Sequence, residues 1–82
     1  MRLDKFLKVS RLIKRRTVAN EACSTGHVSV NGKPAKPGAE VKEGDEISIR
    51  MGAKVLTCEV VSVREYAAKN EADSMYRIIS NE

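Results

Sequence analysis

The sequence has little of what many protein functions require. It contains one histidine, two cysteines and three aromatic residues, and it has no tryptophan. Nucleophile motifs, metal-ligand spacings and phosphate-binding glycine loops are absent from the sequence, so we expect no catalytic residue, no metal and no cofactor. The cysteines, Cys23 and Cys58, lie in apolar patterns without a CxxC spacing, and we interpret them as reduced core thiols. The chain is therefore not expected to be an enzyme.

Long apolar runs are also missing. No run approaches the roughly 18 residues of a membrane span, and the N-terminal MRLDKFLK lacks the apolar segment of a secretory signal. We therefore expect a cytoplasmic protein without membrane contact. The length of 82 residues predicts a single domain, 1–82, and a composition of 41% hydrophobic and 32% charged residues is typical of folded proteins.

Positive charge is concentrated at the start of the chain. Residues 1–16 contain seven basic residues and one acid, a net charge of +6, whereas residues 17–82 contain eight basic and ten acidic residues, or −2. Such a local positive field favours a polyanion, most often nucleic acid, although a charge run is in many proteins only a solvated face. The few aromatic residues provide no platform for stacking unpaired bases, which favours recognition of a folded RNA through its shape and phosphates.

The first part of the pattern is helical. Apolar residues recur on one face of residues 3–9, which predicts a short helix with its basic residues on the other side. After a connection at 10–16, Thr17 is a predicted N-cap for a second helix at 18–25, and Gly26 is placed to end it in a left-handed conformation. The predicted apolar face of this helix comprises Val18, Ala19, Ala22 and Cys23.

The pattern then alternates with period two, which is typical of strands. Residues 28–30 alternate, and Asn31-Gly32 predicts a tight hairpin turn. The remaining predictions are a turn at 42–45, a strand with Ile47 and Ile49, a turn at Gly52, the longest strand at 54–63, a loop or short helix at 64–74, and a last strand at 75–79 with Met75 and Ile79 inward. The predicted fold class is α+β, with two short N-terminal helices packed on a small, mostly antiparallel β-sheet.

Several of these segments together resemble a known family. RLDKFL at 2–7, a second helix ending at Gly26, GHVSVNGKPAKPG at 26–38 and VKEGDEI at 41–47 resemble the RNA-binding domain named for ribosomal small-subunit protein four. The resemblance implies an alpha-L-like RNA-binding module at 1–50, with the C-terminal strands of 51–82 completing the sheet.

Within that family, RLDKFLKVSRLIKRRT is most similar to bacterial ribosome-quality-control factors, and heat-shock protein fifteen is next. The resemblance implies binding of large-subunit rRNA and of peptidyl-tRNA on a stalled large ribosomal subunit. An RqcH-type tailing factor would then add a C-terminal, mostly alanine tail while this monomeric protein stabilises the tRNA. The relatives of heat-shock protein fifteen leave open a second role, the recycling of tRNA-bearing large subunits.

The candidate RNA-binding residues are Arg2, Lys5, Lys8, Arg11, Lys14, Arg15, Arg16, Thr17, Lys33 and Lys36. Asp4 has two interpretations: a first-turn acid that suits the helix dipole, or a side chain that orients Arg16 or Arg11 for RNA. His27 is expected at the surface or a strand edge. A helix-turn-helix DNA-binding regulator and a protein-interaction module are the rival functions, but a second helix presenting Asn20 and Glu21 is a poor major-groove probe.

Overall fold

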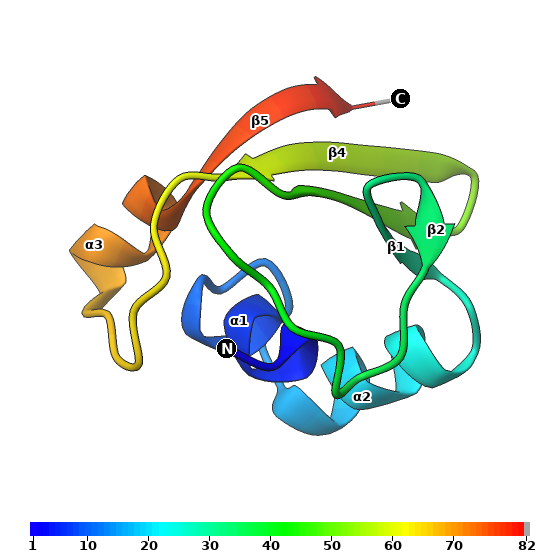
Figure 1. The fold of residues 1–82 in the computed structure, drawn as a ribbon, viewed down its shortest axis with the longest axis horizontal. Helices are drawn as coiled ribbons and strands as arrows, with labels where there is room; N and C mark the ends of the chain where they lie inside the picture. The colour runs from blue at the N-terminus through cyan, green and yellow to red at the C-terminus, as the bar shows by residue number, and fades with distance from the viewer. Residues whose placement is uncertain (82) are drawn as a thin grey trace.

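The computed structural model describes residues 1–81 and combines short helices with one five-stranded sheet (Figure 1). Its elements are α1 (Leu3–Val9), α2 (Arg16–Ser24), β1 (Val28–Val30), β2 (Lys33–Pro34), β3 (Glu46–Met51), β4 (Lys54–Val60), α3 (Lys69–Ala72), the 3-10 turn η1 (Asp73–Met75) and β5 (Tyr76–Asn81). The strand order is β2-β1-β3-β4-β5 and every pairing is antiparallel. The predicted α+β class is confirmed.

The core lies between the two N-terminal helices and one face of the sheet (Figure 1). Leu3, Phe6 and Leu7 of α1 are fully buried because helical spacing places them on one side. Ile47 and Ile49 meet them from β3, where period-two alternation turns both toward the helices. This packing holds α1 at a fixed position on the sheet and leaves Lys5 and Lys8 on its outer side.

Both cysteines are buried and unbonded, as the sequence predicted. Cys23 of α2 and Cys58 of β4 belong to the same core. Burial raises the pKa of each thiol to about 11, so both remain protonated at neutral pH.

Two local turns have the predicted geometry. Gly26 has φ +81°, and the amides of Gly26 and His27 donate to the carbonyls of Cys23 and Ala22, which ends α2 in a Schellman motif. Asn31 and Gly32 both have positive φ, at 52° and 83°, as a two-residue I′ hairpin requires.

The start of α2 differs from the prediction. The helix begins at Arg16, its N-cap is Arg15, and no side chain caps it, so Thr17 lies inside the first turn and is not the N-cap. Val18 is also not part of the apolar face, since half of it is exposed. Ala19 and Cys23, four residues apart, make the buried contact, and Val18 is rotated about 100° away from Ala19 around the helix axis.

The strands of the C-terminal part differ from the prediction. β4 ends at Val60 rather than at 63, and β5 starts after Met75, which is buried as predicted but lies in η1 rather than in the strand. The short helix α3 agrees with the predicted loop or short helix at 64–74. Ile79 is 48% exposed instead of inward. The register of the strand pair explains this, because Tyr76 and Ile78 lie opposite the buried Val60 and Cys58, which puts the inward positions at 76 and 78 rather than at 75 and 79. Ile79 is the extra residue of a bulge between the pairs Cys58–Ile78 and Thr57–Ser80.

Candidate nucleic-acid interface

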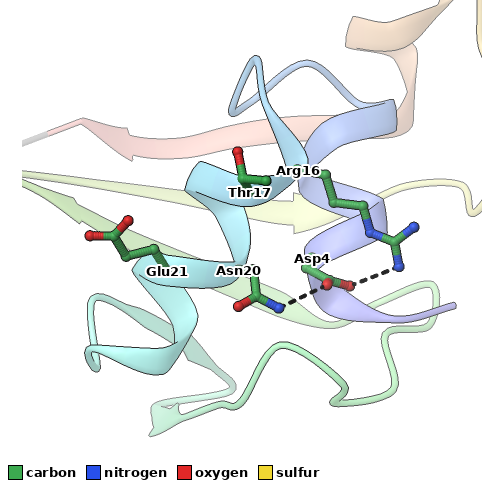
Figure 2. Close-up of a pocket in the computed structure, with 5 residues that line it drawn as sticks. All are labelled: Asp4, Arg16, Thr17, Asn20 and Glu21. Atoms are coloured by element: carbon green, nitrogen blue, oxygen red, sulfur yellow. Dashed lines mark hydrogen bonds and ion pairs between the residues drawn. The ribbon is translucent and has the colours of Figure 1, made fainter.

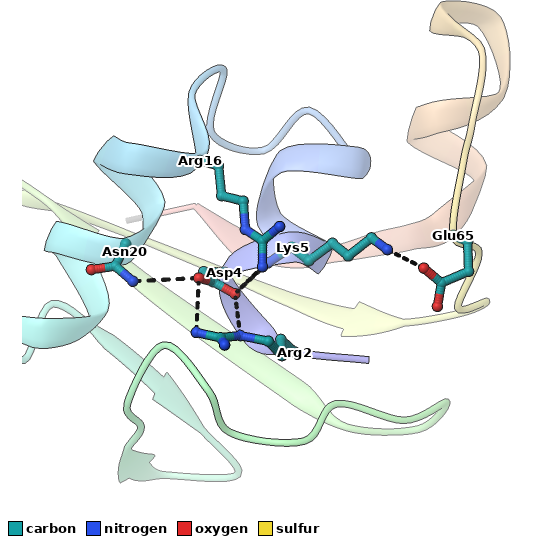
Figure 3. Close-up of polar contacts among 6 residues, drawn as sticks. All are labelled: Arg2, Asp4, Lys5, Arg16, Asn20 and Glu65. Carbon is teal, nitrogen blue, oxygen red and sulfur yellow. Dashed lines mark hydrogen bonds and ion pairs between the residues drawn. The ribbon is translucent and has the colours of Figure 1, made fainter.

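Asp4 organises the centre of the basic surface. Its side chain is almost completely buried in the first turn of α1, where Oδ1 accepts the backbone N–H of Lys5 at 2.8 Å. Arg2 donates through Nε at 3.2 Å and Asn20 through Nδ2 at 3.4 Å, while Arg16 forms an ion pair at 3.5 Å (Figure 3). We call Arg2, Asp4, Arg16 and Asn20 the Asp4 cluster.

Secondary structure places these four side chains together. Arg2 directly precedes α1, whereas Arg16 and Asn20 are four residues apart on α2 and therefore lie on one face of that helix. The packing of α2 beside α1 turns this face toward Asp4 (Figure 3). Two arginines from separate segments thus share one carboxylate.

The electrostatics keep Asp4 charged. Burial alone would raise its pKa, but hydrogen bonds from Asn20 and Arg2 and the positive charge of Arg16 outweigh burial and lower the pKa. One ionised carboxylate therefore faces two guanidinium groups, and the side chains of Arg2 and Arg16 remain 55% and 48% exposed. The Asp4 cluster has a net charge of +1 and offers free N–H donors to solvent.

A cleft opens beside the cluster along the first turns of α2. It has a volume of about 450 Å³ and is lined by Asp4, Arg16, Thr17, Asn20 and Glu21 (Figure 2). The free N–H groups at the start of α2 and the guanidinium of Arg16 favour an anion at one end of this cleft. Glu21 lies at the other end (Figure 2).

The other basic residues of the segment surround the cluster. Lys5 is half-buried and forms an ion pair with Glu65, whose pKa that contact lowers (Figure 3). The remaining side chains are exposed: Lys8 in α1, Arg11, Lys14 and Arg15 in the connection between α1 and α2, and Lys33 and Lys36 in β2 and after it. The carbonyl of Pro37 accepts the amide of Asp4 at 3.1 Å, so Lys36 lies on a segment in contact with α1.

The two interpretations of Asp4 now have structural counterparts. Asp4 does occupy the first turn of α1, and of the two arginines considered for it, Arg16 is the one in ion-pair contact, not Arg11. Sequence reasoning missed the roles of Asn20 and Glu65. The four-residue spacing from Arg16 could have indicated Asn20, but no local signal pointed to Glu65.

His27 is exposed, and its Nδ1 lies 2.7 Å from Oγ1 of Thr25, in agreement with a surface position. Among residues 1–81, no three His, Cys, Asp or Glu side chains come together as metal ligands. The helices of this same range are all too short or too polar to cross a bilayer.

A cationic helix pair on a small antiparallel sheet defines an S4-type RNA-binding module, and residues 1–47 match the family described as S4 domain. The RQC P-site tRNA stabilizing factor of Halalkalibacterium halodurans is 56% identical over 82 residues, which cover 100% of this chain and 93% of the relative. The factor of the same name from Listeria monocytogenes is also 56% identical, with 100% and 89% covered. Trimeric heat shock protein 15 of Vibrio cholerae has a similar structure, with TM-score 0.89, 32% identity and coverage of 98% and 82%. The chain therefore belongs to the S4-domain family, in the group of RQC P-site tRNA stabilizing factors (RqcP).

Proposed function

We propose that this protein is a non-enzymatic rRNA- and tRNA-binding factor of ribosome-associated quality control. It binds stalled large ribosomal subunits that carry peptidyl-tRNA and stabilises this tRNA while the nascent chain receives its C-terminal alanine tail. The name of the full-length relatives supports the P-site tRNA as ligand. An RqcH-type tailing factor as partner, a cytoplasmic location, a monomeric state and 1–82 acting as one domain, with 1–50 as the RNA-binding module, belong to the same proposal.

The Asp4 cluster is the observation that carries the RNA-binding part. An arginine fork suits bidentate contact with phosphate, but a free arginine side chain loses rotamer entropy when it binds. The buried carboxylate of Asp4 already orients Arg2 and Arg16 while half of each side chain stays accessible. The proposed RNA surface is the one predicted from the sequence, with Asp4 as the orienting residue. It comprises Arg2, Lys5, Lys8, Arg11, Lys14, Arg15, Arg16, Thr17, Lys33 and Lys36.

Binding is tested by cosedimentation of the full chain with large subunits loaded with peptidyl-tRNA, at increasing salt. We expect a log–log slope of about −0.7 to −0.9 per neutralised phosphate. Arg2→Ala and Arg16→Ala should each weaken binding by about 1–3 kcal/mol, while the loss of one screened ion pair lowers the melting temperature by less than roughly 8 °C. Arg77→Ala is the matched control, since Arg77 pairs with Glu59 on β4, away from the Asp4 cluster. Salt-independent binding, or equal losses in all three variants, would contradict the proposal.

The role on the subunit is tested by tail length in a reaction reconstituted from loaded subunits, RqcH and titrated protein. A binder stabilises the state it occupies, so tailing should saturate near one copy per subunit, and full activity far below that ratio would indicate turnover. Volume-conserving replacement of both cysteines should leave the effect intact, whereas Arg16→Glu should abolish it. Binding without any effect on tailing would favour the recycling role of heat-shock protein fifteen.

A further inference from the structure

The sheet has a second face, opposite α1 and α2. Val28 of β1 and Ile49 of β3 are buried toward the helices and pair with one another. Because side chains alternate along a strand, their neighbours Ser29, Ser48 and Arg50 point to the opposite face. Helices α1 and α2 pack on the first face (Figure 1).

Hydroxyl groups form a row across this second face. Ser29 of β1 is directly opposite Ser48 of β3, Ser48 is opposite Thr57 of β4, and Thr57 is opposite Ser80 of β5. The hydroxyls of Ser48 and Thr57 are 3.2 Å apart. The register of four strands thus aligns uncharged donors and acceptors from residues far apart in the sequence.

A cleft lies at one end of this row. It has a volume of about 190 Å³ and is lined by Gly26, His27, Ser29, Ser48, Arg50 and Val55. None of these lining residues is acidic, which distinguishes it from the cleft at Asp4 and Glu21. The backbone N–H of Arg50 donates to the carbonyl of His27 at 2.8 Å, so the backbone of these two residues is adjacent at the cleft.

Arg50 is available for a ligand. It is exposed and, like Arg11 and Arg15, has no carboxylate among residues 1–81 within ion-pair distance, whereas the other four arginines each have such a partner. A guanidinium fork beside two serine hydroxyls is the donor set that proteins use for phosphate oxygens of nucleic acids. Val55, the cross-strand partner of Arg50, adds an exposed apolar surface that suits a ribose.

We propose that this cleft is a second phosphate-binding site, which takes the sugar-phosphate backbone of a second RNA segment. The protein then contacts RNA on two opposite faces, through the Asp4 cluster on the helices and through Arg50 on the sheet. This inference rests on the proposed RNA-binding function and assigns a second RNA contact to residues of the sheet, outside the Asp4 cluster. Arg50 supplies the charge, and Ser29 and Ser48 supply hydroxyl donors.

The test is an NMR titration of the ¹⁵N-labelled full chain with a short RNA hairpin, and separately with inorganic phosphate. We expect two groups of amide shifts, one at Lys5, Thr17 and Asn20, and the other at Ser29 and Ser48. Arg50→Gln should weaken binding at the second group by about tenfold or more, as loss of a charge-assisted contact does, and leave the first unchanged. Arg16→Gln should do the reverse.

Lys54→Gln is the matched control, because it removes one charge from a neighbouring position that alternation places on the other face. Ser48→Ala keeps all charges and should weaken only the second group. Shifts at the first group alone would overturn this proposal while leaving the proposed function intact, and shifts at neither would overturn both. Equal effects of Arg50→Gln and Lys54→Gln, or phosphate binding as tight as RNA binding, would also overturn it.

Discussion

Replacement of Asp4 by Asn separates positioning from simple charge attraction. The substitution raises the net charge of the chain from +4 to +5, so charge alone predicts tighter binding to RNA. The geometry predicts the opposite. Without the carboxylate, Arg2 and Arg16 lose their shared acceptor. The NH₂ group of Asn is a donor and cannot accept a hydrogen bond from the guanidinium groups, which are donors themselves. We expect weaker RNA binding despite the additional positive charge.

The magnitude follows from the contacts of Asp4. Its carboxylate is contacted by one backbone N–H and by three side chains, which make four contacts, all between 2.8 and 3.5 Å, and Asp4 is 2% exposed. Because both arginine partners are half exposed, each ion pair is screened and contributes less than 1 kcal/mol. With the buried hydrogen bonds included, the loss of stability should be about 2 kcal/mol, which lowers Tm by roughly 8–16 °C in a domain of this size.

The stability that Asp4 contributes depends on pH, and the direction follows from its lowered pKa. The pKa of Asp4 is lowered in the folded protein, so its contribution to stability is complete above the unfolded value of 3.8. That contribution is lost as the pH falls through the lower pKa of the folded state. The difference in unfolding free energy between the wild type and Asp4→Asn should therefore be constant at neutral pH and disappear under acid conditions.

The assay is urea unfolding combined with RNA binding at a temperature where every variant is folded. Asp45→Asn is the matched control, since Asp45 is also buried, accepts hydrogen bonds from Asn31 and from the amide of Lys42, and has no arginine partner among residues 1–81. It makes the same change in charge, and we expect a loss of stability without weaker RNA binding. If Asp4→Asn binds RNA as tightly as Asp45→Asn, Asp4 does not position the arginines.

Two further predictions concern the scaffold. Gly26→Ala should destabilise the protein by about 1 kcal/mol, measured by thermal unfolding, because φ +81° is unfavourable for a residue with a Cβ; an unchanged Tm would refute this. Cys23 and Cys58 should resist a thiol alkylating agent at pH 8, because burial raises the pKa of both to about 11. The rate of labelling, measured by mass spectrometry, should match the rate of unfolding, and rapid labelling of the native protein would contradict this prediction.

Several features of this protein were predictable because they depend on neighbouring residues. The apolar spacing of residues 3–9 is a property of one helical turn and the next, and α1 has the predicted bounds. Asn31-Gly32 adopts the positive φ angles that its two residues tolerate best. The charge excess in residues 1–16 is read directly from the sequence. The same local pattern places this segment on α1, the connection and the start of α2.

Boundaries were less predictable, since they depend on what the rest of the fold provides. Thr17 is a good capping residue, but packing against α1 extends α2 to Arg16 and leaves the Thr17 side chain without a capping bond. Alternation from Met75 placed Ile79 inward, but the register puts Tyr76 and Ile78 opposite the buried Val60 and Cys58 and leaves Ile79 exposed. A register is set by the pairing of two strands, and neither strand encodes it alone.

The chemistry of the surface was decided by tertiary structure. The sequence by itself determined that cations gather near residues 1–16 and that Asp4 is the only acid among them. The packing of α2 against α1 determined that Asp4 binds Arg2, Arg16 and Asn20, and the return of the chain at 65 determined that Glu65 pairs with Lys5. Such partners depend on distances of a few ångströms between distant segments, which composition and periodicity do not contain, and only the folded chain sets them.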